Sequence, residues 1–145
     1  MSAGGPTSKE LPTEDLARLR EIFARVPYVG LLGLEFVGAE RGAATFALEV
    51  RDELTRMGGI MHGGAVVSLL DTAAAFAVHT VVGADTRTVT VDLTVHFLRP
   101  ASDGRIEALA RVLRRGRNVC VLSVEARDSS AQIVATATMT YFIQT

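Results

Sequence analysis

The sequence predicts an α+β domain in which one strongly curved antiparallel sheet wraps around a single long helix. Two observations lead to this prediction. Residues 62–81 are apolar nearly all round, which is typical of a helix covered by other structure on every side. Six segments with strand-like patterning flank this helix, two before it and four after it, and short turns favour antiparallel neighbours.

The N-terminal part of the chain predicts a tail followed by one helix. Residues 1–12 are small and polar and contain proline and glycine, which is typical of a flexible tail, and they show no secretory signal. Thr13 is expected to be the N-cap of an amphipathic helix over residues 13–26, which Pro27 is expected to end. Residues 13–145 are then one domain.

The expected strands are bounded by turn signals. They cover residues 34–41, 43–50, 87–98, 105–114, 118–127 and 131–143. In the third strand the alternation predicts an apolar face of Val89, Val91, Leu93, Val95 and Phe97, and a polar face of Thr88, Thr90, Asp92, Thr94 and His96. The outer edges of the sheet need cover, which favours oligomerisation.

The composition fits a globular domain and excludes several classes of function. Of the 145 residues, 48% are hydrophobic and 21% are charged, so the chain can bury a core. The net charge of -1 argues against a nucleic-acid binder. The single cysteine, Cys120, excludes an intrachain disulfide, and its apolar neighbours predict a buried structural thiol. The three histidines lack metal-ligand spacing, so we expect neither a metal nor a cofactor.

Residues 65–82 are the only candidate for a membrane span. They carry Asp71 and His79, lack flanking basic and aromatic anchors, and barely reach spanning length. A buried helix explains the same residues better, so we expect no membrane and a cytoplasmic location.

The stretch from Gly58 to Asp71 is the candidate site. The N–H of Gly63 is one of the unpaired donors in the first turn of a helix, which suit an oxyanion or a polarised carbonyl. Asp71 places a carboxylate inside an apolar helix, which is costly unless it has partners or a function. The ordinary alternatives are a capping role for His62 and a structural hydrogen bond for Asp71. No nucleotide-binding or Gly-x-Ser-x-Gly motif is present.

His62 and Asp71 cannot meet within one regular helix. They are nine residues apart. This spacing puts them on opposite faces, ~13 Å apart along the axis. A site that uses both residues therefore needs two subunits with antiparallel helices side by side.

The string Gly-Gly-Ile-Met-His-Gly-Gly-Ala-Val-Val-Ser-Leu-Leu-Asp-Thr-Ala, residues 58–73, resembles the PaaI-like hotdog thioesterases of the phenylacetate-pathway type. That family carries His-Gly-Gly with an Asp nine residues after the His, as here. The segments 91–100, 115–118 and 135–141 are also similar, and the resemblance covers about residues 29–144. It implies a hotdog fold, hydrolysis of acyl-CoA, and a dimer or a dimer of dimers (a homotetramer).

The resemblance also implies roles for single residues. Asp71 corresponds to the catalytic base or nucleophile, and Gly63 to the donor that polarises the thioester carbonyl. His62 and Gly64 help to shape that pocket, and Thr90 matches a Ser or Thr near the attacking water. Basic residues around a glycine turn bind coenzyme A phosphates in relatives; here the turn contains Arg114, Arg115, Arg117 and Asn118.

One position departs from the family pattern. Many relatives have Asn six residues before the His, and this chain has Arg56, which accepts no hydrogen bond. Arg56 is expected to pair either with Asp71 across a subunit interface or with a carboxylate or phosphate of the ligand. Three functions stay open: acyl-CoA thioesterase, hydratase or dehydratase acting on acyl thioesters, and non-catalytic acyl-CoA-binding protein.

Overall fold

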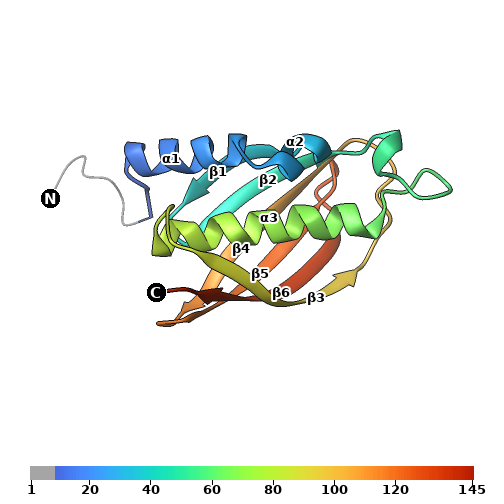
Figure 1. Cartoon of the computed structure of the whole chain (residues 1–145). Helices are drawn as coiled ribbons and strands as arrows, with labels where there is room; N and C mark the ends of the chain where they lie inside the picture. Colours follow the sequence, from blue (N-terminus) through green and yellow to red (C-terminus); the bar gives the residue numbers. More distant parts are fainter. Residues whose placement is uncertain (1–8) are drawn as a thin grey trace, which may run out of the picture.

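A computed structural model of the chain describes residues 9–145 (Figure 1). Most of the predicted tail, residues 1–12, lies outside the described residues. The elements follow in the order α1 (Thr13–Ala24), α2 (Pro27–Leu32), β1 (Glu35–Glu40), β2 (Ala43–Glu49), the 3-10 helix η1 (Asp52–Leu54), α3 (Gly63–Val82), β3 (Thr88–Phe97), β4 (Arg105–Arg115), β5 (Val119–Arg127) and β6 (Ile133–Ile143).

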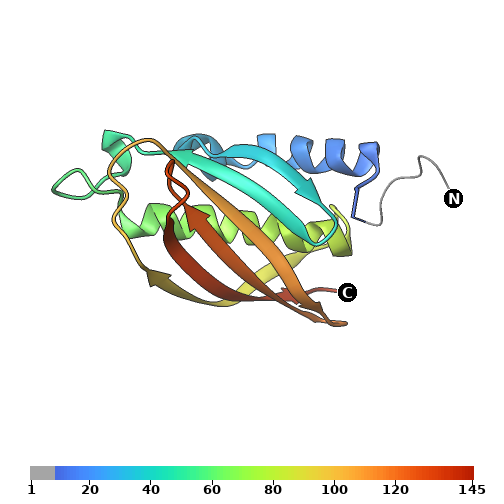
Figure 2. The ribbon, with the colours of Figure 1, turned by 180° about the vertical axis from the view of Figure 1, so that it is seen from behind.

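The strands form one antiparallel sheet in the order β1-β2-β4-β5-β6-β3. The sheet curves around α3, and α1 and α2 lie beside its β1–β2 end (Figures 1 and 2). This arrangement confirms the predicted α+β fold with a long central helix. It also leaves β1 and β3 as the two edge strands.

The core lies between α3 and the concave face of the sheet. Leu69, Leu70, Ala73 and Ala74 of α3 are fully buried, and the alanines let the helix approach the strands closely. Four phenylalanines, Phe23, Phe36, Phe46 and Phe76, join α1, the sheet and α3, with ring centroids 4.7 to 5.9 Å apart. The one described helix that is long and apolar enough to cross a membrane, Gly63–Val82, is therefore the core helix of this fold.

The start and end of the N-terminal helix differ from the prediction. Pro12, not Thr13, is the N-cap of α1, and no side chain caps this helix. Helix α1 already ends at Ala24, with Arg25 as its C-cap. Pro27 does not simply stop a helix: it begins α2, because its fixed φ suits the first helical turn, where no N–H is needed.

The predicted alternation in β3 is wrong in its first half. A bulge lies between Thr90 and Asp92, so Val91 has no partner on β6. Thr90 is paired with Tyr141, and Leu93 with Met139, and both partners on β6 are buried. Directly paired residues share a face of the sheet. The bulge therefore turns Thr90 toward the helix side, together with Leu93 instead of opposite to it.

Candidate active site

The Asp71 carboxylate is held by two hydroxyl groups from neighbouring strands. Thr90 on β3 donates from Oγ1 to Asp71 Oδ1 over 2.9 Å. The Tyr141 hydroxyl on β6 donates to the same Oδ1 and also lies 2.8 Å from the backbone oxygen of Asp71. Within residues 9–145, Oδ2 of Asp71 has no hydrogen-bond donor. One carboxylate oxygen is thus fixed, and the other is available for chemistry.

The register of the sheet explains why both hydroxyls reach the helix. Thr90 and Tyr141 are directly opposite each other on β3 and β6, so their side chains leave the sheet side by side. Tyr141 is only 2% exposed. Burial, with the nearby Asp71 charge as a second cause, raises the pKa of Tyr141 well above its ordinary value, so the phenol stays protonated and remains a donor.

His62 caps the core helix. It is the N-cap of α3, and its Nδ1 accepts a hydrogen bond of 2.8 Å from the N–H of Gly64. In the neutral ring the proton is then on Nε2. A Cβ atom on Gly64 would lie 3.0 Å from His62 Nδ1, so a glycine at this position lets the cap close tightly. Of the two interpretations of His62, the capping role is the one for which the single chain supplies a contact.

A cavity of about 310 Å³ lies at the N-terminus of α3. Gly63 is the first residue of the helix, and its N–H has no acceptor among the described residues. A Cβ on Gly63 would lie 3.3 Å from the Phe97 ring, so the absence of a side chain keeps this wall open. Mostly apolar residues line the cavity, together with the arginines Arg56 and Arg99, so the N–H of Gly63 faces partly apolar surroundings that suit a polarised carbonyl.

Arg56 lies on the rim of this cavity, in a tight loop that projects from the end of the molecule before α3 (Figure 1). The N–H of Arg56 donates to Ile60 O over 2.8 Å, and Gly58 and Gly59 take positive φ angles of 93° and 74° to close the loop. The guanidinium donates to the backbone oxygen of Met57 at 3.1 Å. Within the chain Arg56 makes no ion pair with Asp71 in residues 9–145.

The basic turn between β4 and β5 lies at the opposite end of the molecule. Figure 1 shows this turn close to the C-terminus, whereas Gly63 lies at the far end of α3. Asn118 has a structural role there: its Nδ2 donates to Ile143 O at 3.3 Å, and its own backbone oxygen accepts from Ile143 N at 2.7 Å. Arg115 and Arg117 are exposed and have no ion-pair partner among residues 9–145.

The single chain brings Asp71 and Thr90 together, but it does not bring them to Gly63, His62 or the basic turn. Tyr141 is the site residue that sequence reasoning missed. The available signal was a hydroxyl-bearing aromatic residue on the buried face of the last strand, opposite Thr90. No group of three or more His, Cys, Asp or Glu in residues 9–145 can hold a metal ion, and the expected absence of a metal stays a prediction. Cys120 is fully buried, as predicted.

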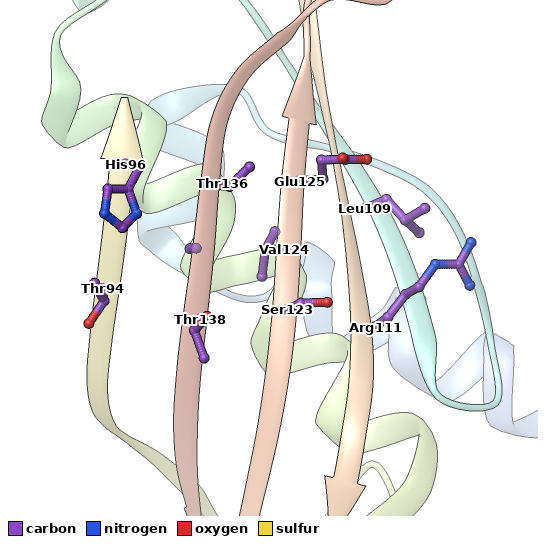
Figure 3. A pocket seen from close by; sticks show the side chains of 10 residues that line it. Thr94, His96, Leu109, Arg111, Ser123, Val124, Glu125, Thr136 and Thr138 are labelled. Carbon is purple, nitrogen blue, oxygen red and sulfur yellow. The ribbon is translucent and has the colours of Figure 1, made fainter. Parts of the chain in front are cut away.

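A second hollow, of about 360 Å³, lies on the outer face of the sheet (Figure 3). Its lining includes Thr94, His96, Arg111, Ser123, Glu125 and Thr138 from β3 to β6. Thr94 is paired with Thr138, and the next pair along the two strands, Leu93 and Met139, faces the core. Because side chains alternate along a strand, Thr94 and Thr138 point away from α3, and the hollow opens on that side. It is therefore separate from the Asp71 carboxylate.

The sheet wraps around a core helix, which carries an oriented carboxylate and begins with an N–H donor. These features define the hotdog class of thioester-processing proteins. A family model described as the Thioesterase superfamily matches residues 58–135, and the chain belongs to this superfamily of thioester hydrolases. The predicted family, fold and enzyme class are thus confirmed.

Individual relatives agree with this assignment. The chain is 30% identical to a putative esterase of Saccharolobus solfataricus over 91% of its length and 87% of that protein. It is 31% identical to the medium/long-chain acyl-CoA thioesterase YigI of Salmonella typhimurium, covering 81% of this chain and 86% of YigI. Among solved structures, a mutant form of the phenylacetic acid degradation protein PaaI from Thermus thermophilus is 31% identical, with a TM-score of 0.74 over 81% of this chain and 98% of that one.

Proposed function

We propose that the protein is an acyl-CoA thioesterase that converts an acyl-CoA into the free acid and coenzyme A. The observation that carries this proposal is the Asp71 carboxylate, which has one oxygen held by Thr90 and Tyr141 and the other free. The YigI relatives are medium/long-chain acyl-CoA thioesterases, which supports acyl-CoA as the substrate class.

In the proposed reaction, the N–H of Gly63 and the start of α3 polarise the thioester carbonyl. The oxygen of a water molecule forms a bond to the carbonyl carbon while Asp71 Oδ2 accepts one water proton. The carbon–sulfur bond then breaks, and the proton passes from Asp71 to the departing sulfur. The products are a carboxylic acid and the coenzyme A thiol, so atoms and charges balance.

A second route uses Asp71 as the nucleophile. Oδ2 then attacks the carbonyl carbon and releases the thiolate, and water hydrolyses the resulting anhydride. Hydroxylamine captures an anhydride as a hydroxamate, so its formation on Asp71 during turnover distinguishes this route from base catalysis.

The proposed site is shared between two copies of the chain. Edge strand β3 exposes apolar side chains, with Val91 59% and Phe97 56% exposed, as expected of a strand that pairs with a second copy. Antiparallel pairing across this edge reverses the direction of the second α3. One subunit then supplies Gly63 and His62, and the other supplies Asp71. Analytical ultracentrifugation tests this proposal, and a species that stays monomeric at micromolar concentration contradicts it.

The same reversal gives the basic turn a role. Helix α3 has 20 residues, which makes it ~30 Å long. Within one chain the turn lies at the far end of α3 from Gly63. In an antiparallel pair, however, each turn lies at the end where the other subunit begins its helix. We propose that Arg115 and Arg117 bind coenzyme A phosphates there, while Arg56, Gly64 and Asn118 contact or support the bound substrate.

The test is thiol release from a panel of aryl-, short-, medium- and long-chain acyl-CoAs. Asp71→Asn keeps the side-chain shape and removes the base, so we expect a 10²- to 10⁴-fold loss of kcat, roughly the range for general acid–base groups. Asp103→Asn, in an exposed turn, is the matched control. If no substrate releases thiol, the thioesterase proposal fails.

A second candidate is a protein that binds acyl-CoA without hydrolysing it. It is favoured by the presence of Arg56, which accepts no hydrogen bond, where many relatives have Asn. Saturable coenzyme A binding without thiol release supports that function. Loss of enoyl-CoA ultraviolet absorbance instead supports a hydratase.

A further inference from the structure

Tyr141 is one of only two tyrosines in the chain, and it is among the largest fully buried side chains. Its ring packs in the core, and its hydroxyl reaches the only carboxylate inside the apolar helix. Neither the motif around Gly63 nor the position of Thr90 assigns it a role. A buried hydroxyl needs a partner, but its ring packing does not require that partner to be the carboxylate.

The hydrogen bonds of Tyr141 tie the Asp71 side chain to its own backbone. The phenol lies against both Oδ1 and the backbone oxygen of Asp71, so one hydroxyl proton is shared between two acceptors of the same residue. Thr90 donates to Oδ1 from the neighbouring strand. With both donors on one oxygen, rotation of the carboxylate breaks two hydrogen bonds at once.

Toward the Asp71 carboxylate, the phenol acts as a donor. Because burial and the adjacent Asp71 charge raise its pKa, it keeps its proton at neutral pH. It is only 2% exposed, so we do not expect it to touch a substrate.

We propose that Tyr141 is the positioning residue that selects the reacting oxygen of Asp71: it holds Oδ1 so that Oδ2 alone faces the thioester. This inference rests on the proposed thioesterase function. Tyr141 is expected to hold the carboxylate more firmly than Thr90 does. Tyr141 is buried and makes two hydrogen bonds to Asp71, whereas Thr90 is exposed and makes one.

Tyr141→Phe keeps the ring and removes only the hydroxyl. A hydrogen bond to a charged group, when lost, corresponds to roughly a ten- to hundredfold change in rate. We expect kcat to fall by this factor while KM stays within about twofold, because the substrate loses no contact.

The other tyrosine provides a matched control. Tyr28 on α2 is 51% exposed, and its hydroxyl is 2.8 Å from Ser68 Oγ on the same helix α3. Tyr28→Phe therefore removes a phenol hydrogen bond to α3 that does not involve the carboxylate, and we expect kcat to stay that of the unaltered protein. Combining Tyr141→Phe with Asp71→Asn should slow the reaction no further than Asp71→Asn alone, because Tyr141 acts through Asp71.

Three results overturn the inference: an unchanged kcat in Tyr141→Phe, a rise in KM at constant kcat, or an equal loss in Tyr28→Phe. If the unaltered protein releases no thiol, the proposed function fails, but the positioning role is still decided by crystal structures. A rotated or disordered Asp71 carboxylate in Tyr141→Phe supports it, and an unchanged carboxylate refutes it.

Discussion

Replacing Gly63 by alanine separates the stability of α3 from the chemistry at its start. The new Cβ would lie 3.3, 3.6 and 3.9 Å from three atoms of the Phe97 ring. Only the first of these contacts is tighter than ordinary van der Waals contact, which begins at about 3.5 Å. The closest atom is the far end of the Phe97 ring, so a shift of a few tenths of an ångström relieves the contact. Alanine is favoured over glycine in a helix by about 0.5–1 kcal/mol, so we expect a net change in stability within about 1 kcal/mol.

The activity of Gly63→Ala is expected to fall much further than its stability. The methyl group enters the 310 Å³ cavity beside the backbone N–H that the proposed mechanism uses. A displacement of the carbonyl by about 1 Å costs on the order of 10²-fold in rate. Thiol release and thermal unfolding, measured on the same preparation, test both parts.

Gly30→Ala is the matched control, since Gly30 lies in helix α2 and a Cβ there would meet nothing within 4 Å. It should gain stability without changing kcat/KM. Full activity in Gly63→Ala would refute the placement of the thioester carbonyl at the start of α3.

Three further predictions concern other parts of the site and core. Thr90→Val should lower kcat by roughly tenfold, since a hydrogen bond to the charged Asp71 is lost, whereas Thr90→Ser should retain most activity. Arg115→Ala and Arg117→Ala should raise KM for acyl-CoA, but not for the matching N-acetylcysteamine thioester, which has no phosphates; equal effects on both would contradict phosphate binding. Burial raises the pKa of the Cys120 thiol, so its contribution to stability should be lost as the pH rises above the ordinary thiol value, about 8.5. Denaturant unfolding at neutral and alkaline pH measures this loss, which Cys120→Ala should reduce.

The overall fold could be predicted because its signals are local. The apolar helix and the period-two strands are visible in short windows, and α3 (Gly63–Val82) begins and ends within a residue or two of the prediction. The N-terminal helix was less predictable because proline is compatible with two roles. Pro27 cannot continue a helix, but it is well suited to begin one, and only packing against the sheet selects the short helix α2.

The site was predictable only where a residue is unusual in its own segment. Asp71 is conspicuous in an apolar helix, and Gly63 in a glycine-rich approach to that helix. No local signal marks the bulge at Val91, although this single unpaired residue decides which face Thr90 occupies. Tyr141 lies 70 residues from Asp71 in the sequence, so their hydrogen bond exists only after the sheet has closed around the helix.

The proposed division of the site between two subunits, with Gly63 on one and Asp71 on the other, can be tested by mixing two inactive variants. Gly63 and Asp71 are eight residues apart on one helix. This places them ~12 Å apart along the axis, too far to act on the same carbonyl. If each site takes Gly63 from one subunit and Asp71 from the other, a mixed dimer of Gly63→Ala and Asp71→Asn chains contains one site with both substitutions and one with neither. Random reassortment of equal amounts makes half of the dimers mixed, so about a quarter of the unaltered activity should return. If both groups act within one chain, every site carries one substitution and mixing restores nothing.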